Sequence, residues 1–392
     1  MPTTRFTPSD VDELRAVLAD TTASHPRLLV EGAGTAATTG GRPDPADAVV
    51  DTTGLSGVLR YNPADMTVAV RAGTPLTQVQ AELAGQRVAF DPARGRRGAT
   101  VGGLLATADG GPARQQFGVL RDLVIGATVV LADGTVAHSG GHVIKNVAGY
   151  DLAKLFHGSL GTLGVVAEVV LRLHPLPRHV VTVAVPGPAE EATRTGTDLL
   201  GRGIEPAALE WTPDSGLLVR LEGTEEGVLA RAGAVEAVGG TILSDDAQAA
   251  AWADVDAVAD PAAPGTTVLR AGTLPSDGPG FVATLAAAAA RAGADLAVSS
   301  GVGTGVHTVA LTGGDHAAVL AAAHAAAGPA VTVLRHGGLD PAAPLWGPPP
   351  AAVALLRAVK QRFDPTGRFG AGRLSPWLAP VHDVPATEGV PA

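Results

Sequence analysis

The pattern of hydrophobic and polar positions divides the chain into segments with different expected structures. Residues 9–20 predict an amphipathic helix, because Ser9 opens an acidic first turn and the apolar positions share one face, at Val11, Leu14, Val17 and Leu18. Short apolar runs separated by Gly and Pro predict strands at residues 27–31, 48–51 and 67–71. A second helix is expected at residues 77–84, so the N-terminal region mixes helix and strand.

The middle of the chain combines glycine-rich segments with long apolar strands. Residues 98–111 read GATVGGLLATADGG, and residues 140–164 are also dense in glycine, which is unusual for an ordinary core. Apolar runs predict strands at residues 123–132, 135–138 and 165–173, the first two joined by a turn at Asp133-Gly134. Pro175 and Pro177 then mark a domain boundary.

After residue 186 the pattern becomes an alternation of helices and strands. Ala-rich stretches predict helices at residues 189–200, 227–238, 280–292 and 315–327. Short apolar runs predict strands at residues 216–222, 267–271, 296–299, 305–311 and 330–334. We therefore expect a sheet covered by helices, followed by a late helix at residues 345–363. No internal repeat is evident in the sequence.

These patterns predict an α+β protein in three parts. Residues 1–177 are expected to form a first domain and residues 178–378 a C-terminal α+β domain. Residues 379–392 have the composition of a flexible tail.

Composition and charge narrow the class of protein. The 392 residues carry a formal charge of −10, which argues against nucleic acid as the main ligand. The polar start and the lack of an 18-residue apolar run predict no secretory signal and no membrane span. We expect a cytoplasmic protein, either free or held at the inner face of the membrane through partners. Cys is absent, which excludes disulfides, thiolate-bound iron–sulfur clusters and a cysteinyl cofactor bond.

Three segments have residue types that suit a ligand. Residues 31–35, EGAGT, follow a strand and present backbone N–H groups that bind phosphate oxygens, although such a turn also occurs without a ligand. They lack the GxGxxG pattern of a dinucleotide fold. Residues 100–107, TVGGLLAT, either lie flat against a planar ligand or pack a helix on a sheet. In residues 145–152, Lys145 suits an anion and Asn146 a ring edge, whereas Asp151 suits a helix cap.

Taken in order, these segments resemble the FAD-binding domain of the vanillyl-alcohol oxidase and p-cresol methylhydroxylase (PCMH) superfamily. Within it they are similar to the small FAD-binding subunit of bacterial glycolate oxidase, through GPAR at 111–114, VLRD at 119–122, GGHVIKNVAGYD at 140–151 and GSLGTLG at 158–164. The similarity covers about residues 5–177. FDPTGRFGAGR at 363–373 resembles the closing signature of the family, except that Gly370-Ala371 replaces its usual Asn-Pro.

This resemblance implies a two-subdomain PCMH-type domain with FAD between the subdomains, and a C-terminal cap that faces the isoalloxazine ring. It assigns the pyrophosphate to residues 32–36, the ribityl, pyrophosphate and flavin to residues 98–111, and the adenosine side to residues 158–166. The residues expected at the cofactor are Gly32, Ala33, Gly34, Thr35, Ala36, Gly98, Ala99, Thr100, Gly102, Gly103, Thr107, Gly110, Lys145, Asn146, Gly161, Thr162, Gly164, Val165 and Val166. Without Cys, and without His in residues 32–51, the FAD is expected to be non-covalent.

Oxidation of a 2-hydroxy acid on a flavin needs a base for the hydroxyl proton and a cation for the carboxylate. No residue is assigned to catalysis; the candidates are Lys145, His307 and Arg373, with Arg114 and His142 as further cations. Arg114, like Arg121, also suits a surface or subunit contact, and His307 also suits a structural position in its strand. His316 and His324 lie eight residues apart without a nearby acid, so no metal site is expected.

The function expected from this resemblance is oxidation of a 2-hydroxy acid, glycolate to glyoxylate, by one subunit of a complex. The implied partners are a larger FAD subunit and an iron–sulfur subunit that receives the electrons. Two alternatives stay open: a free-standing FAD oxidase of a sugar lactone or alditol, and a non-catalytic subunit that holds FAD for assembly.

Overall fold

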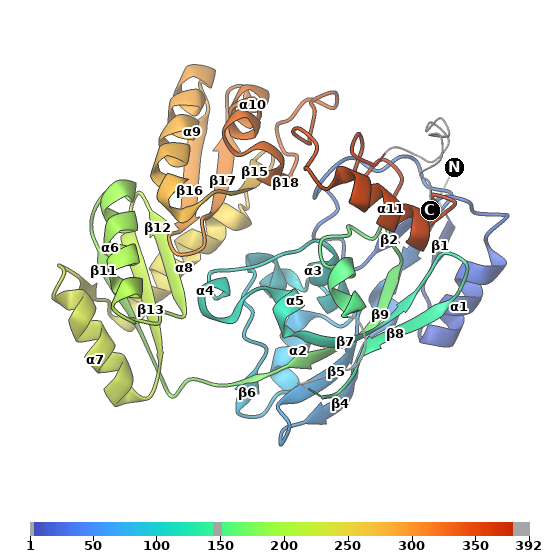
Figure 1. Cartoon of the computed structure of the whole chain (residues 1–392), viewed down its shortest axis with the longest axis horizontal. Helices are drawn as coiled ribbons and strands as arrows, with labels where there is room; N and C mark the ends of the chain where they lie inside the picture. Colours follow the sequence, from blue (N-terminus) through green and yellow to red (C-terminus); the bar gives the residue numbers. More distant parts are fainter. Residues whose placement is uncertain (1–3, 144–150, 379–392) are drawn as a thin grey trace, which may run out of the picture.

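The computed structural model describes residues 4–143 and 151–378 and arranges their strands in four sheets (Figure 1). The described helices and strands confirm the α+β class predicted from the sequence. Within these residues, no helix combines the length and the apolar character needed to cross a bilayer.

The first sheet is small and parallel, and the N-terminal helix covers it. Its strands lie in the order β1 (Thr4–Phe6), β3 (Ala48–Asp51) and β2 (Leu28–Glu31). Helix α1 (Val11–Asp20) buries Leu14 and Leu18 completely. Asp10 is the N-cap and accepts a hydrogen bond from the Glu13 backbone N–H, while Ser9 donates to the Glu13 carboxylate. The predicted helix is therefore present and begins one residue later than Ser9 implies.

The second sheet is antiparallel and has five strands, in the order β4 (Val58–Asn62), β5 (Thr67–Arg71), β9 (Val165–Arg172), β7 (Val124–Val130) and β8 (Val136–Gly140). The short helices that accompany it are η1 (Thr52–Gly54), α2 (Leu76–Glu82), η2 (Ala93–Arg97), α3 (Val101–Ala106), α4 (Arg114–Phe117), α5 (Leu120–Leu123) and η3 (Leu152–Phe156). Apolar side chains of the sheet and of α2, α3, α5 and η3 form one core. A two-stranded pair, β6 (Gln86–Arg87) with β10 (His174–Pro175), leads out of this region.

The third sheet has eight antiparallel strands, and we call it the cap sheet. Its order is β14 (Thr241–Ile242), β11 (His179–Val185), β13 (Gly216–Gly223), β12 (Ala208–Thr212), β16 (Asp295–Gly301), β17 (Val306–Thr312), β15 (Thr267–Gly272) and β18 (Val331–Arg335). Each half of the sheet comes from a strand–helix–strand–strand–helix–strand unit, and the two units meet where β12 pairs with β16. The structure thus contains a repeat that the sequence does not reveal.

Helices cover the two faces of the cap sheet unequally. On one face lie α6 (Ala189–Gly201), α7 (Glu225–Glu236), α9 (Gly278–Ala292) and α10 (His316–Ala327), with short turns η4 (Pro275–Asp277) and η5 (Gly328–Ala330). Helix α8 (Asp245–Ala259), which the sequence pattern did not predict, packs on the other face through Trp252 and Val255. That second face turns toward the first two sheets, and α8 contacts η2 there.

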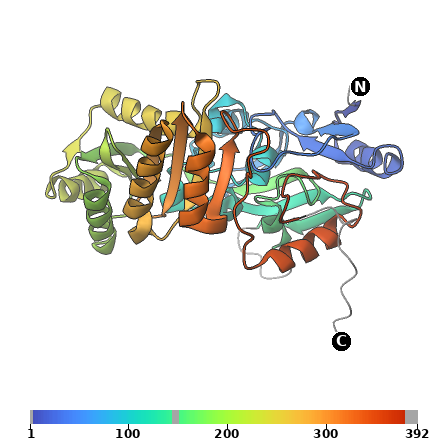
Figure 2. The same ribbon diagram turned by 90° about the horizontal axis from the view of Figure 1, so that it is seen from above.

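After β18 the chain leaves the cap sheet and returns to the first two sheets. Helix α11 (Val353–Phe363) is shorter than the predicted 345–363 helix, because Pro348, Pro349 and Pro350 precede it. Figure 2 shows α11 beside the strands of the second sheet, apart from the cap helices. The Phe363 ring meets Phe156 edge-on at 5.8 Å, and Phe369 is fully buried in the core of the first sheet.

The domain limits at residues 177 and 378 stay predictions, although Pro175 lies in the β10 strand that precedes the cap sheet. The predicted tail, residues 379–392, lies outside the described residues.

Candidate functional site

A cavity of about 300 Å³ lies where the first two sheets meet. Three separate glycine-rich segments line it, and most of the predicted cofactor residues are among them: Gly32, Ala33, Gly34, Thr35, Ala36, Thr100, Gly102, Gly103, Thr107, Gly161, Gly164 and Val166. The fold therefore brings together three segments that lie far apart in the sequence. Arg94 and Arg373 line the same cavity.

The first segment turns sharply as the chain leaves β2. Gly34 has φ +72°, a left-handed conformation that glycine adopts without strain. A Cβ atom on Gly32 would lie 2.5 Å from the Thr100 Oγ1, so the close approach of the first and second segments requires glycine there. This contact explains why the two predicted motifs belong to one wall of the cavity.

The second segment forms the short helix α3. Thr100 caps this helix, because its hydroxyl accepts a hydrogen bond from the Gly103 N–H at 3.2 Å. A Cβ on Gly102 would lie 2.8 Å from the Ala72 Cβ, so this glycine allows α3 to pack against the end of β5. Residues 100–107 were expected either to lie against a ligand or to pack a helix on a sheet. In the structure this segment packs on the sheet and also lines the cavity.

The remaining predicted residues do not line this cavity. Gly98 ends η2 in a left-handed conformation, and Ala99 is buried in the core of the second sheet. Val165 is fully buried in the core of the first sheet, and the Thr162 hydroxyl donates to the Ser159 carbonyl at 2.7 Å. Gly110 lines a separate cavity of about 30 Å³. Lys145 and Asn146 lie outside the described residues.

Arg94 and Arg373 place two buried cations beside the cavity, and sequence reasoning missed Arg94. Arg94 donates from Nε to Asp109 at 2.9 Å and from Nη1 to the Thr39 hydroxyl at 2.9 Å. Arg373 donates from Nη1 to the Thr39 carbonyl at 2.7 Å. Arg94 stands in an Ala-Arg-Gly-Arg-Arg run that suits an exposed turn, so nothing in the sequence marks it as buried.

Each of these guanidinium groups keeps a donor without a partner. Arg94 Nη2 and Arg373 Nε are buried and have no hydrogen-bond partner within residues 4–143 and 151–378. Burial lowers the pKa of Arg373, and the nearby Glu31 carboxylate offsets this lowering only in part. Unsatisfied buried donors are costly, so this pair fits an anionic group in the cavity. With the small-residue walls, these groups fit the diphosphate and flavin portions of FAD.

His307 lies away from this cavity. Its strand, β17, turns the imidazole toward the helix-covered face of the cap sheet, where the ring lies 5.0 Å from the Phe281 ring. Its nitrogens contact the Ser300 and Thr273 hydroxyls, both at 2.9 Å, and burial lowers its pKa to about 4. These contacts agree with the structural reading of His307 rather than with a base at the flavin.

The other candidate residues are scattered. His142 lines a groove on the outer side of the second sheet, and Arg121 is exposed near Asp122. No cluster of three or more potential metal-ligating side chains is found in the part of the chain that the structure describes. Arg114 lies between the first two sheets and the cap sheet, in the 30 Å³ cavity that also contains Glu210.

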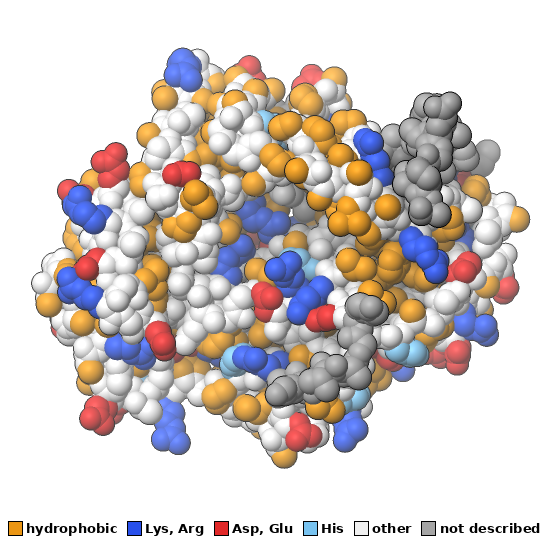
Figure 3. All heavy atoms as spheres, viewed as in Figure 1, with side chains coloured by type: hydrophobic (Ala, Val, Ile, Leu, Met, Phe, Trp, Pro, Cys, Tyr) orange, Lys and Arg blue, Asp and Glu red, His pale blue; other side chains and the backbone are white. Residues whose placement is uncertain are grey.

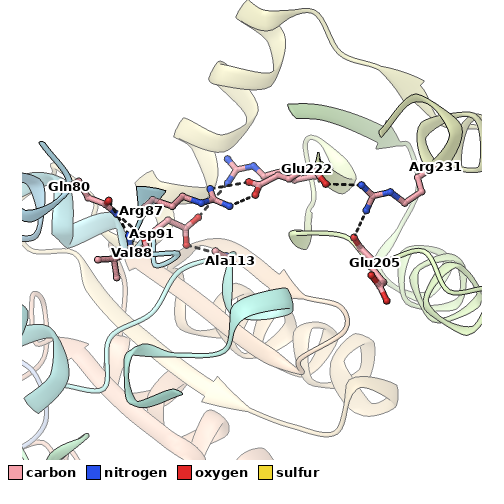
Figure 4. A network of polar contacts seen from close by, with 9 residues as sticks. Gln80, Arg87, Val88, Asp91, Ala113, Glu205, Glu222 and Arg231 are labelled. Carbon is pink, nitrogen blue, oxygen red and sulfur yellow. Dashed lines mark hydrogen bonds and ion pairs between the residues drawn. The ribbon is translucent and has the colours of Figure 1, made fainter. Parts of the chain in front are cut away.

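Salt bridges fasten the cap sheet to the region that carries the cavity (Figure 4). Arg87 of β6 pairs with Glu222 of β13, and Asp91 accepts from Arg220 of the same strand at 3.4 Å. Arg97 of η2 pairs with Asp260 at the end of α8. These ion pairs therefore hold the cap against residues 87–97, the segment that also supplies Arg94 to the cavity.

Comparisons with known proteins agree with this geometry. A family profile described as an FAD binding domain matches residues 2–140. The chain is 31% identical over 326 residues to the glycolate oxidase subunit GlcE of Escherichia coli, covering 81% of this chain and 84% of GlcE. It is 33% identical over 222 residues to the glycolate oxidase subunit GlcD of Bacillus subtilis, covering 56% of this chain and 47% of GlcD.

The chain is also similar in sequence to a dehydrogenase and in fold to a synthase. The chain is 34% identical over 205 residues to a D-lactate dehydrogenase of Archaeoglobus fulgidus, covering 52% of this chain and 46% of that enzyme. A solved structure of alkyldihydroxyacetonephosphate synthase superposes with a TM-score of 0.66 and covers 93% of this chain and 74% of the synthase. At 14% identity, that likeness shows the PCMH-type fold alone.

Proposed function

The chain belongs to the family of FAD-linked oxidoreductases that includes the glycolate oxidase subunit GlcE, and from this premise we propose that it oxidises a 2-hydroxy acid with bound FAD. Glycolate is the proposed substrate, and glyoxylate the product. The other relatives above, a GlcD subunit and a D-lactate dehydrogenase, support a substrate of the same class.

The observation that carries this proposal is the cavity beneath Arg94 and Arg373. Its three glycine-rich walls leave backbone close to any ligand, and its two arginines leave buried donors without partners. Residues 32–36 would hold the diphosphate through their N–H groups, with the Arg94 and Arg373 guanidiniums meeting negative charge on the cofactor. Bound FAD supplies the acceptor for the hydride that leaves the substrate carbon.

The protein's own contribution is to hold the cofactor, to orient the substrate and to keep water away from the reacting atoms. The Arg87–Glu222 and Asp91–Arg220 pairs, which hold the cap sheet against the FAD-binding region, support the last of these tasks. The hydroxyl proton of the substrate needs a base, and that role is unassigned among the residues described. Lys145 remains a candidate that lies outside them.

We further propose that the protein acts in a complex with a larger FAD subunit and an iron–sulfur subunit, in the cytoplasm or at the inner face of the membrane. The absence of Cys supports this proposal, because electrons that reach this flavin need an iron–sulfur acceptor on another chain or a diffusible one. The subunit names of the GlcE and GlcD relatives support it as well.

The test is a visible spectrum of the purified chain before and after anaerobic addition of glycolate. We expect a flavin absorbance that corresponds to about one FAD per chain. Addition of glycolate or D-lactate should bleach this absorbance as the flavin is reduced. A colourless protein that takes up no added FAD would contradict the proposal. If the isolated chain binds FAD but is reduced only after co-expression with its partner subunits, the complex is required for oxidation.

A further inference from the structure

Residues 39–41 lie between the FAD cavity and the edge of the cap sheet, and we call them the connector. They come shortly after residues 32–37, which line the cavity. Thr39, Gly40 and Gly41 are all buried, and Thr39 does not itself line the cavity. Any effect of Thr39 on a ligand in the cavity must therefore act through other residues.

On one side, the connector is hydrogen-bonded to β18, the edge strand of the cap sheet. The Gly40 N–H donates to the Val333 carbonyl at 2.7 Å, and the Thr39 hydroxyl donates to the Leu334 carbonyl at 3.1 Å. His336, just beyond β18, donates from Nε2 to the Gly40 carbonyl at 2.7 Å. These contacts cover a strand edge that would otherwise leave backbone groups without partners.

An irregularity in β18 explains how the strand offers Leu334 to the connector. The register of β18 on β15 shifts between Val268 and Leu269, which leaves Leu334 without a partner in the ladder. An extra residue of this kind stays unpaired and bends its strand. The Leu334 carbonyl is therefore available to accept a hydrogen bond from the Thr39 hydroxyl.

On the other side, the connector holds both arginines of the FAD cavity. The Thr39 hydroxyl oxygen accepts from Arg94 Nη1 at 2.9 Å, and the Thr39 carbonyl accepts from Arg373 Nη1 at 2.7 Å. Thr39 is completely buried, and both arginines are almost so. Hydrogen bonds are strong in such surroundings, because water does not compete for them. One residue thus contacts the cap sheet and both cavity arginines.

The Thr39 hydroxyl serves both sides at once, because it has one proton to donate and lone pairs to accept with. Its proton goes to the Leu334 carbonyl, so its oxygen is left to accept from Arg94. Asp109 holds the same guanidinium through Nε at 2.9 Å, and Thr39 supplies a second point that fixes its plane. Arg94 Nη2 and Arg373 Nε then remain as the unpaired cavity donors among residues 4–143 and 151–378.

A second contact from the cap sheet supports the same arginine less directly. Arg270 of β15 donates from Nη1 to the Ala108 carbonyl at 2.7 Å. Ala108 precedes Asp109, which accepts from Arg94. The cap sheet therefore reaches Arg94 from two of its strands, through Thr39 and through the backbone beside Asp109.

Elsewhere the boundary between the cap and the rest of the molecule is more exposed. Figure 3 shows Lys and Arg side chains gathered in a hollow at the centre of one face. The Arg97 side chain, which pairs with Asp260 of the cap, is 56% exposed. Solvent weakens such a pair, so the buried hydrogen bonds of the connector are better suited to fix a geometry at the cavity.

We propose that Thr39 is a positioning residue that couples docking of the cap sheet to FAD binding. This inference rests on the proposed function for the identity of the ligand. In the docked cap, the Leu334 carbonyl takes the Thr39 proton, which fixes the hydroxyl oxygen where Arg94 meets it. FAD binding and cap docking then stabilise each other, because a coupling between two equilibria is reciprocal.

The test compares Thr39→Val with Thr39→Ser in the full chain. Valine has the shape of threonine but cannot donate or accept, whereas serine keeps the hydroxyl. We expect Thr39→Val to raise the Kd for FAD about 10-fold, as for loss of a hydrogen bond to a charged group. Thr39→Ser should stay within about 2-fold of the wild type. Titration of the apoprotein with FAD, followed by flavin fluorescence, measures both.

Thr182→Val is the matched control. Thr182 of β11 is also completely buried, and it does not line the FAD cavity. Its hydroxyl likewise accepts from an N–H, the Trp252 indole at 2.9 Å, and donates to an oxygen, Gln248 Oε1 at 3.2 Å. Thr182→Val should destabilise the fold and leave the Kd for FAD unchanged. An equal rise in Kd in both valine variants would mean general loosening of the protein, and the proposal would be wrong.

A second measurement needs no substitution to give a result. Reciprocal coupling predicts that FAD slows hydrogen exchange in the peptide that spans β18, in the wild type and in Thr39→Ser. The slowing should be lost in Thr39→Val. If FAD leaves the exchange of β18 unchanged in the wild type, cap docking and FAD binding are not coupled.

These outcomes separate the coupling from the proposed function, because FAD binding is measured without any 2-hydroxy acid. A protein whose FAD no 2-hydroxy acid reduces, but whose Thr39→Val variant binds FAD weakly, retains the coupling and loses the proposed activity. A protein that oxidises glycolate while Thr39→Val binds FAD as the wild type does retains the activity and loses the coupling.

Discussion

Arg373 shows how one side chain reaches the cavity from the far end of the sequence. The turn before it needs glycine, since Gly370 has φ +55° and Gly372 has φ +82°. The Arg373 carbonyl accepts from the Gly41 N–H at 2.9 Å and from the Trp346 indole at 3.0 Å, which fixes the backbone. The Gly370-Ala371 departure from the family signature therefore keeps a backbone that presents Arg373 to the cavity.

We predict that Arg373→Gln weakens FAD binding. Loss of a charge-assisted hydrogen bond corresponds to about 1.5 kcal/mol or more, so the Kd for FAD should rise about 10-fold. Fluorescence titration of the apoprotein with FAD measures this change. Arg291→Gln, at an exposed position late in α9, is the control and should leave the Kd unchanged. Equal affinities in the two variants would show that Arg373 does not contact the cofactor.

Glu210 gives a prediction about pH. Burial raises its pKa to about 7 in the folded protein, above the value near 4.3 expected in the unfolded chain. The folded state then binds more protons between these values, so this group makes stability fall as the pH rises from about 4.3 to 7. Glu210→Gln should remove a decrease of about 4 kcal/mol across that window, at 1.36 kcal/mol for each pKa unit.

Urea unfolding of the wild type and Glu210→Gln at pH 5 and pH 8 measures the Glu210 effect. The free energy of unfolding of the wild type, relative to the variant, should be lower at pH 8 than at pH 5. A difference that does not change with pH would mean that the Glu210 pKa is not raised.

At the scale of single residues, the sequence predicted the small residues that line the site better than the charged ones. Gly32, Thr100 and Gly161 were predicted because their glycine-rich segments, taken in order, resemble those of the FAD-binding family. Arg94 and Thr39 were not predicted as site residues, because an Arg or Thr looks the same in the sequence on an exposed surface and in a buried cleft. Burial and lost partners, which only the fold provides, distinguish the two.

At the scale of elements, the segment after α11 acts as a structural anchor. Arg368 is almost completely buried, and its guanidinium donates to the carbonyls of Leu18, His25 and Ala132. Asp364 accepts from the backbone N–H groups of Arg368 and Phe369, at 2.9 and 2.8 Å. The Asp-Pro-Thr-Gly-Arg-Phe part of the closing signature thus fastens the C-terminal segment to α1 and β7.

We predict that Arg368→Met strongly destabilises the protein. The substitution leaves three backbone carbonyls buried without these donors, and the expected loss is about 3–5 kcal/mol of unfolding free energy. Arg362→Met, at an exposed position in α11, is the matched control and should change stability by less than about 0.5 kcal/mol. Urea unfolding followed by circular dichroism distinguishes the two, and similar losses in both variants would contradict the anchoring role.

Element predictions succeeded where the pattern was simple. The turn at Asp133-Gly134 is present, with Gly134 at φ +85° and the Thr135 N–H donating to Asp133. Helix α8 was missed, because its many Ala residues give only a weak amphipathic pattern. The repeated strand–helix unit of the cap was missed too. Many different apolar residues can fill the strands of a buried sheet, so the two units need not resemble each other in sequence.

At the scale of the whole molecule, ion pairs contribute to holding the cap sheet against the rest of the protein. Glu222 pairs with Arg87, and its backbone carbonyl accepts from Arg231 at 2.7 Å, so the pair is supported from within the cap (Figure 4). The Arg220 guanidinium lies 4.3 Å from the centre of the Trp252 ring and also meets Asp91. These contacts place the cap face that carries Arg270 and Glu210 opposite α4.

We predict a measurable coupling between Arg87 and Glu222. Because the Glu222 side chain is 9% exposed and that of Arg87 22%, solvent screens this pair less than a surface pair. A double-mutant cycle with Arg87→Ala and Glu222→Ala should give a coupling of about 1 kcal/mol in unfolding free energy. The exposed pair Arg202 and Asp198 should give about 0.3–0.5 kcal/mol. Additive effects at Arg87 and Glu222 would show that the pair does not hold the cap.

The sequence by itself determined the α+β class, the FAD-binding resemblance and the glycine-rich walls, because backbone that approaches a ligand closely tolerates few residue types. Only the tertiary structure decided which charged groups meet. It placed Arg373 beside Arg94 through the turn at Gly370. It also turned His307 into the helix-covered face of the cap sheet and directed Arg270 to the Ala108 carbonyl. The reason is physical: a side chain's charge and hydrogen-bonding role depend on neighbours brought from distant segments, which local sequence patterns do not encode.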